Sequence, residues 1–308
     1  MMCFAAKQAF SGAGLAIVCL VISGTAYAHD SPNDVIDALS HRIEVEGATA
    51  ALLVSRAYEY RAYGDMESAE RDLRGAMALN SANGAAYISL GQLYVYQGKG
   101  AEALEVVRAG LSTVDDQEYR GGLHALGAEA HVLGKAWTLA LDEIGLALEV
   151  SSNDLERIQL KSMILGKSGR HEERVLYLRE ASNGNSSVVL VIELVDGLRD
   201  ARRYVECLKL IDGYIEKRRW KAEWILRRAE VFGLMGDDVS MRADAERALD
   251  EIVERLRVSK PDEFLYELRA RAAGFLEGAG VRSRSADEED EEDEIAAASA
   301  AALDAEVE

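Results

Sequence analysis

Proline and cysteine are scarce in this chain of 308 residues. Its two prolines are Pro32 and Pro261. Because proline breaks helices, the long stretch between them can be helical throughout, interrupted only where glycine turns the chain. Of the three cysteines, Cys3 and Cys19 lie in an N-terminal segment that we expect to be removed. Cys207 then remains alone, which excludes an intramolecular disulfide and makes packing the source of stability.

Positive charge is also in deficit, because 35 Lys and Arg residues face 54 Asp and Glu residues, a formal net charge of −19. Binding to a phosphate backbone depends on Lys and Arg. The composition therefore disfavours nucleic acid and anionic membrane surfaces as ligands. The acids are densest at residues 287–294, an unbroken run of eight. Such a run repels itself and buries little apolar surface, so residues 281–308 are predicted to be an acidic, disordered tail.

The N-terminus has the layout of an export signal. Lys7 precedes an apolar run over residues 12–22, and small residues follow up to Ala28. This order is typical of a secretory signal peptide, here residues 1–28. The apolar run is shorter than the roughly 20 residues of a membrane-spanning helix. A retained anchor and a lipid attached to Cys19 are the alternatives. We expect a mature protein that is periplasmic or secreted, with no stable membrane insertion after cleavage.

Turn residues recur at a nearly constant interval between the two prolines. They are Gly64, Gly98, Gly134, Gly169 and Gly236, with Arg202 in place of a glycine between the last two. Neighbouring members of this series are 33 to 36 residues apart. A period near 34 residues is typical of repeats that each consist of two helices joined by a turn.

The side chains within each period follow a size pattern. The first helix carries a large residue, a small one four positions later and a large one three further on; the second carries small, bulky and small residues. Residues 50–83 fit with Leu53, Ala57, Tyr60, Ala69, Leu73 and Ala76, and residues 84–117 with Tyr87, Gly91, Tyr94, Ala103, Val107 and Gly110. Small residues let two helices approach closely. Exceptions at small positions are Arg174, Tyr214 and Met241.

Over residues 50–250 this pattern resembles the tetratricopeptide-repeat (TPR) family, with about six repeats. The resemblance implies an all-α, right-handed superhelical solenoid of helix-turn-helix repeats, with the first helix of each repeat lining an inner groove. Residues 29–49 and 251–280 are then expected to be capping helices, because the terminal units of a solenoid need covers. Ser31 and Pro32 read as the N-cap and first residue of the first capping helix.

The repeat register also predicts which side chains face the groove. The candidate partner-binding residues are Val54, Tyr58, Arg61, Ile88, Gln92, Tyr96, His124, His131, Gln159 and Arg199, and the same register includes Ala128 and Leu226. Mixed aromatic, apolar and polar groups suit an extended peptide or a helix. The carboxylate clamp found in some members of the family needs Lys and Asn where Tyr58, Gln92 and Ala128 stand, so that type of clamp is not expected.

No pattern of catalytic or metal-binding residues stands out. His124 and His131 are seven residues apart, so they lie about 10 Å from each other along a helix, too far to bind one metal ion together. Cys207 falls at a small, packed position, which predicts a buried and inert thiol rather than a nucleophile. Phosphate-binding glycine loops, serine elbows and zinc motifs are absent from the sequence. We therefore expect no enzyme activity, no cofactor and no metal.

The sequence thus predicts a non-enzymatic scaffold that binds a peptide or partner protein in its groove. The alternative is a carrier or chaperone-like protein that uses its acidic tail to bind basic proteins or cations. The identity of the partner is not encoded in any motif.

Overall fold

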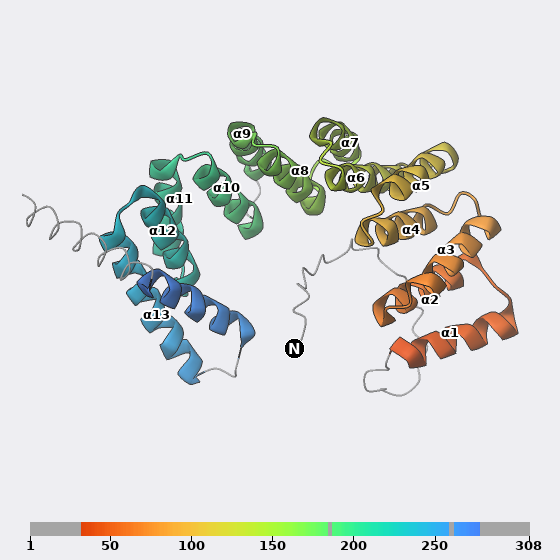
Figure 1. Ribbon diagram of the computed structural model, residues 1–308, viewed down its shortest axis with the longest axis horizontal. Coiled ribbons are helices and arrows are strands. Elements are labelled where there is room, and N and C mark those ends of the chain that lie inside the picture. Colours follow the sequence, from red (N-terminus) through yellow and green to blue (C-terminus); the bar gives the residue numbers. More distant parts are fainter. Residues whose placement is uncertain (1–31, 184–186, 259–261, 278–308) are drawn as a thin grey trace, which may run out of the picture. The chain divides into compact units, whose positions relative to one another are not determined.

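The computed structural model describes residues 32–183, 187–258 and 262–277, which form helices and contain no strand (Figure 1). The predicted signal peptide, Ser31 and the acidic tail lie outside these residues. The chain divides into two compact units, residues 1–185 and 186–308. Among the described helices, none is long and apolar enough to cross a membrane.

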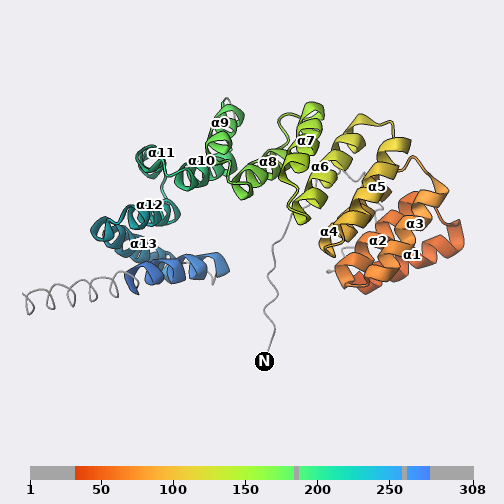
Figure 2. The same cartoon turned by 45° about the horizontal axis from the view of Figure 1, so that its top comes forward.

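The first unit contains nine helices within the described residues. They are α1 (Pro32–Glu46), α2 (Ala50–Tyr63), α3 (Met66–Leu79), α4 (Gly84–Tyr96), α5 (Gly100–Thr113), α6 (Gln117–Leu133), α7 (Trp137–Val150), α8 (Leu155–Lys167) and α9 (His171–Ser182). Each packs against the next, and alternate helices such as α2 and α4 also touch (Figure 2). The unit is therefore a stack of helix pairs.

The second unit is built in the same way. It contains α10 (Val188–Asp200), α11 (Tyr204–Lys217), α12 (Ala222–Met235) and α13 (Asp238–Val258), followed by a helix over residues 263–277. Successive helices pack on one another here as well. The expected all-α fold of helix-turn-helix repeats is confirmed within each unit. Helix α13 runs through residue 250 without a break, so the predicted boundary at that residue lies inside a helix.

All six turns between paired helices close with the same hydrogen bond. A backbone N–H just after the turn donates to the carbonyl oxygen five residues earlier, as in Lys99 to Tyr94 at 2.8 Å and Asp237 to Phe232 at 2.9 Å. A residue with positive φ precedes each donor, a geometry that favours glycine. Arg202 takes this place with φ of 58°, as the spacing predicts.

The third turn differs from its prediction. Lys135, with φ of 53°, adopts the left-handed conformation, whereas Gly134 has φ of −84°. The turn therefore contains one extra residue, and the small residues Ala140 and Ala147 of the following helix stand one position later than in the other repeats.

Small residues bring neighbouring helices together as predicted. Ala57, Ala69 and Ala76 are at most 2% exposed. A Cβ atom at Gly91 would overlap the side chain of Leu126, which belongs to the next repeat. A larger residue at this position would force Leu126 to move, so Gly91 permits the close packing of α4 and α6.

Two exceptions to the size pattern have local partners. Arg174 is buried, and its Nε donates to Oγ of Ser162 at 2.9 Å, so the charged side chain is met by a small polar residue of the paired helix. Tyr214 stacks on Trp224, with ring centroids 4.7 Å apart. Both repeats keep a closely packed junction by means of side chains that the size rule does not foresee.

Arginine clamps fix the first and the last repeat. Arg56 of α2 makes two hydrogen bonds to the Asp72 carboxylate, at 2.7 and 2.8 Å, and a third to Ser40 of α1 at 3.0 Å. Arg228 of α12 binds Asp244 twice at 2.7 Å and Asp212 of α11 at 2.6 Å. The two sets have identical spacing. Because Ser40 takes the place of Asp212, α1 acts as the second helix of a preceding repeat.

Candidate functional site

The candidate site lies on the first helices of the repeats in the first unit. We call it the A-helix face and define it by Val54, Tyr58 and Arg61 on α2, Ile88, Gln92 and Tyr96 on α4, His124 and His131 on α6, and Gln159 on α8. Arg199, the tenth predicted residue, lies on α10 in the second unit. The nine residues of the face are all at least partly exposed.

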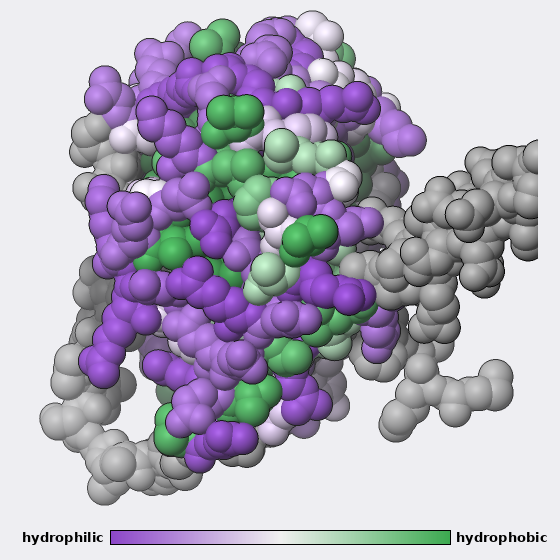
Figure 3. Space-filling view, turned by 90° about the vertical axis from the view of Figure 1, so that its left-hand side faces the viewer, coloured by the Kyte–Doolittle hydropathy of each residue, from purple (hydrophilic) through white to green (hydrophobic). Residues whose placement is uncertain are grey.

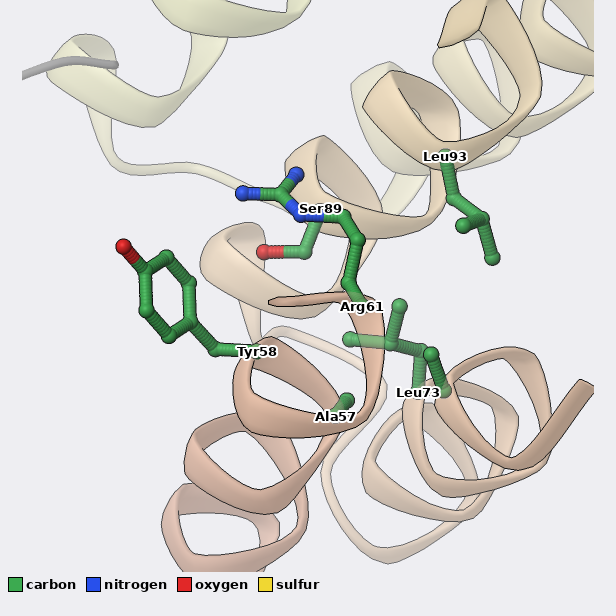
Figure 4. A pocket seen from close by; sticks show the side chains of 7 residues that line it. Ala57, Tyr58, Arg61, Leu73, Ser89 and Leu93 are labelled. Carbon is green, nitrogen blue, oxygen red and sulfur yellow. The ribbon is translucent and has the colours of Figure 1, made fainter. Parts of the chain in front are cut away.

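Helices α2, α3 and α4 enclose a small pocket at one end of this face (Figure 4). Tyr58 and Arg61 of α2 and Ser89 of α4 line it, with Leu73 and Leu93 behind them. Its volume is about 20 Å³. A cavity of this size holds about one water molecule. It is therefore an indentation that a side chain of a larger ligand can enter, and it is too small for a cofactor.

Arg61 is the unpaired cation of this pocket. Its Cζ lies 5.4 Å from the centre of the Tyr58 ring, and it forms no ion pair with a described carboxylate. Arg56, five residues earlier on the same helix, is clamped by Asp72. In a strongly acidic chain most arginines can find a carboxylate partner. Because Arg61 has none among the described residues, its guanidinium is available to an anionic group of a ligand.

Two tyrosines carry most of the exposed apolar surface of the face. Tyr58 is 61% exposed and Tyr96 is 76% exposed. Val54 and Ile88, by contrast, pack partly against the hydrophobic core. Ile88 also reaches α6, because a Cβ at Gly122 would lie 2.7 Å from its Cδ1 atom. Aromatic rings with a polar tip are common anchors in binding surfaces.

His124 has a partner within the protein. Its Nδ1 lies 2.8 Å from Oε2 of Glu143 on α7, so it ties the two helices of its repeat together. It also borders an open depression of about 480 Å³ together with Arg120, Leu146 and Glu149. Arg120 Nη1 donates hydrogen bonds to the backbone carbonyl oxygens of Leu111 and Val114. Within the described part of the chain, no three His, Cys, Asp or Glu side chains gather in a way that could hold a metal ion.

Arg199 belongs to an ion network rather than to an open surface. It binds Asp196 at 3.1 Å, Asp200 at 3.1 Å and Glu230 of α12 at 3.0 Å. Glu230 also pairs with Arg271 of the helix over residues 263–277. These pairs link the helices of the second unit and leave Arg199 less available for a ligand.

Two residues in the predicted groove register are buried. Ala128 is 0% exposed and packs with Ile144 and Ile164, while Leu226 is also 0% exposed. For both, the prediction of a groove-lining position is wrong. Around Ala128, Ile144 of the paired helix and Ile164 of the next repeat belong to the same hydrophobic cluster.

The burial of Cys207 is confirmed. Its side chain is 0% exposed, and burial raises the pKa of the thiol to about 12. A thiol in this state carries almost no thiolate near neutral pH and is a poor nucleophile.

Two features near the site were not found from the sequence. Ser89 lines the pocket but falls outside the groove register. Lys161 lies 4.5 Å from the ring centre of Tyr177, sixteen residues later. The same spacing joins Arg56 to Asp72, so a search for cations followed by a partner at this distance could have detected both pairs.

Known structures share this fold. No protein-family model and no curated protein sequence matches the chain. A tetratricopeptide-repeat protein from Parabacteroides merdae superposes with a TM-score of 0.53 at 21% identity, covering 75% of this chain and 92% of that one. The C-terminal part of a TPR-containing protein from Cytophaga hutchinsonii gives 0.54 at 12% identity, covering 64% and 78%.

A third similar structure is that of the APC/C hetero-tetramer Cut9–Hcn1. Its TM-score is 0.51 at 10% identity, and the match covers 78% of this chain but 46% of that one. With the repeated turns and helix pairs described above, these likenesses identify the class: the chain has the helical-repeat fold of tetratricopeptide-repeat proteins.

Figure 3 shows another face of the molecule, on which hydrophilic side chains predominate and hydrophobic ones form separate patches. Such scattered apolar groups are normal on protein surfaces. The A-helix face differs by combining two uncovered tyrosines with an arginine that lacks an acid.

Proposed function

We propose that the protein is a non-enzymatic interaction scaffold that binds an extended peptide or a helix of a partner protein on its A-helix face. The observation that carries the proposal is the exposure of Tyr58 and Tyr96 on one face, together with Arg61, which lies over the Tyr58 ring and pairs with no described acid. Aromatic and arginine side chains supply most of the energy at protein interfaces. The Cut9–Hcn1 hetero-tetramer is a case in which a chain of similar fold assembles with other chains.

The place of action is part of the same proposal. Lys7, the apolar run of residues 12–22 and the small residues up to Ala28 support export, which would bring the face to partners in the periplasm or outside the cell. A fusion of residues 1–28 to a reporter enzyme that is active only after export tests this. Activity equal to that of a leaderless reporter would contradict it.

Binding is tested by capture of partners from an extract of the envelope and medium of the source cells. Tyr58→Ala combined with Tyr96→Ala should reduce capture of a stoichiometric partner by about tenfold or more, because loss of anchor residues costs at least about 1–2 kcal/mol each. Arg61→Gln should have a smaller effect in the same direction.

A matched control uses two other exposed side chains of the first repeat. Tyr63 is 58% exposed on α2, and Leu79 is 55% exposed on α3, yet neither belongs to the A-helix face. Tyr63→Ala combined with Leu79→Ala removes similar apolar area and should leave capture unchanged. Equal capture by both double variants and the original protein would remove the A-helix face from the account of binding.

A further inference from the structure

A group of cations lies where α11 turns into α12. Lys217 ends α11, and Arg218, Arg219 and Lys221 occupy three of the four positions that connect it to α12. Arg255 of α13 lies beside this connection, over the Trp220 ring. We call these five residues the basic corner. Lys217, Arg218, Arg219 and Arg255 are exposed.

Aromatic rings hold two of these cations in place. The Cζ atom of Arg255 lies 5.3 Å from the centre of the Trp220 ring, and that of Arg218 lies 5.8 Å from the centre of the Tyr214 ring. Tyr214 is itself fixed by stacking on Trp224. Cation–π contacts of this kind position a guanidinium while leaving its N–H groups free for an anion.

Described carboxylates do not neutralise the basic corner. None of the five side chains forms an ion pair with a described acid, in contrast to Arg228, which two aspartates bind. Of the nearby acids, Glu251 accepts the backbone N–H of Lys221 at 3.2 Å, and Glu254 pairs with Arg257 at 3.2 Å. Glu223 pairs with Arg227 at 3.4 Å, and Glu216 lies next to Lys217 in the chain. The corner therefore keeps a surplus of positive charge in a chain whose net charge is −19.

We infer that the basic corner binds the acidic run of the same chain, residues 287–294. Eight consecutive acids face five cations, so the charges are complementary. The last described helix of the second unit ends at residue 277, so the run follows this unit closely along the chain. Nine residues, 278–286, separate that helix from the first acid of the run.

The length of this connection is sufficient. Phe275 packs against the cluster of Ala229 and Met241, so the end of the last helix lies beside the middle of α12. Lys221 precedes Ala229 by eight residues, which is about 12 Å along a helix. A connection of nine residues spans up to about 30 Å when extended. The acidic run can therefore return along α12 to the basic corner.

This docking does not depend on the proposed function of the A-helix face. It bears on the alternative view of the tail as a carrier, because an acidic run that is bound to its own chain must first be released before it binds basic proteins or cations.

Zero-length crosslinking of the full-length protein tests the contact directly. A carbodiimide should join Lys217 or Lys221 to carboxylates of residues 287–294, and the yield relative to total protein should not change on dilution. Links that disappear on dilution would show that the run binds a second copy, and links spread evenly over Lys99, Lys135 and Lys209 would show no docking. Either result overturns the inference.

Competition by a synthetic peptide gives an independent test. The probe is a labelled peptide with the sequence of residues 286–295, titrated against two full-length proteins: the original and one with Asn and Gln replacing Asp and Glu at 287–294. The neutralised protein should bind the peptide about tenfold more tightly, because an attached run competes at an effective concentration of about 1 mM. Equal affinity for both would mean that the corner is open to another acidic partner and would overturn the inference.

The peptide assay has a matched control within the second unit. In the neutralised protein, K217Q combined with R218Q and R219Q should abolish peptide binding, since all three side chains are exposed and the fold does not depend on them. K209Q combined with R242Q and R247Q removes the same charge from exposed sites elsewhere and should keep it. Loss of binding in both triple variants would show that peptide binding depends only on the net charge of the protein, which would contradict binding at the basic corner.

Discussion

The first and the fourth repeat place different side chains at the same junction. In the first, Arg56 is bound by Asp72 and by Ser40 of the preceding helix. In the fourth, Lys161 takes the place of Arg56, Tyr177 that of Asp72, and Gly145 that of Ser40. Lys161 lies over the Tyr177 ring, and the buried Tyr177 hydroxyl has no hydrogen-bond partner in the part of the chain that the structure describes.

The second repeat has an apolar pair at this junction. Leu90 takes the place of Arg56 and Val106 that of Asp72, and both belong to one hydrophobic cluster. The fold therefore tolerates either a complete polar set or an apolar pair at this junction. A polar set in which one member lacks a hydrogen-bond partner should be less stable than either, because a buried charge or hydroxyl without a partner is destabilising. In the first repeat Arg56 has both partners, whereas in the fourth repeat Gly145 offers Lys161 no acceptor side chain.

The largest effect is expected from breaking the complete set. Asp72→Ala leaves the Arg56 guanidinium, whose side chain is 18% exposed, without its carboxylate and should lower the free energy of unfolding by about 3 kcal/mol. The double change Arg56→Met with Asp72→Leu imitates the second repeat and should restore most of this loss. Urea unfolding followed by far-UV circular dichroism measures both. A double variant as unstable as Asp72→Ala would contradict the equivalence of the two solutions.

A half-buried carboxyl group in the same unit, Glu129 of α6, makes stability depend on pH. Burial, with a smaller contribution from Glu156, raises the pKa of Glu129 from 4.5 to about 7. Since the folded state holds the proton more tightly than the unfolded state, the associated stability is present below about pH 4.5 and is lost as pH rises through about 7.

Glu129→Gln should therefore stabilise the protein by up to about 3 kcal/mol near pH 8, because each pKa unit between 4.5 and about 7 contributes about 1.4 kcal/mol. It should have little effect below about pH 4.5. Unfolding free energies across this pH range measure the difference. A constant gain at all pH values would show that Glu129 does not titrate between the two limits.

The sequence predicted the stacked pairs because small residues and turn residues recur with the helical repeat. It correctly placed Arg202 in a left-handed turn, but chose Gly134 over Lys135 in the third, because glycine normally marks the residue with positive φ and here stands one position early. The register also separated exposed Tyr58 and Tyr96 from the core.

Register alone could not decide how deeply each position is buried. Ala128 and Leu226 lie in the predicted groove register, yet both are 0% exposed, and Ala128 shares a hydrophobic cluster with Ile164 of the next repeat. Register also did not predict that Arg199 is held by an ion network, because one of its carboxylate partners, Glu230, comes from another helix. Such contacts depend on which side chains meet across repeats, and periodicity does not specify that.

Completing the fourth junction should produce a smaller gain. Gly145→Asp places a carboxylate sixteen residues before Lys161, the spacing that joins Asp212 to Arg228. No atom lies within 4 Å of a Cβ built at Gly145, so the new side chain fits. The expected stabilisation is about 1 kcal/mol, from the ion pair and from removal of a glycine within a helix. Gly145→Asn is the uncharged control, and a gain equal to that of Asp at low salt would exclude the ion pair.

The smallest effect is expected at the Tyr177 hydroxyl. Burial raises its pKa to about 12, so the group stays neutral, and its oxygen has no hydrogen-bond partner among the described residues. Tyr177→Phe removes this unsatisfied group and keeps the ring beneath Lys161, so the free energy of unfolding should rise by about 0.5–1 kcal/mol. Tyr87→Phe is a suitable control, since Tyr87 is also a largely buried tyrosine of the first unit. If Tyr177→Phe is instead destabilising, the hydroxyl has a partner such as an ordered water, and the fourth junction is as complete as the first.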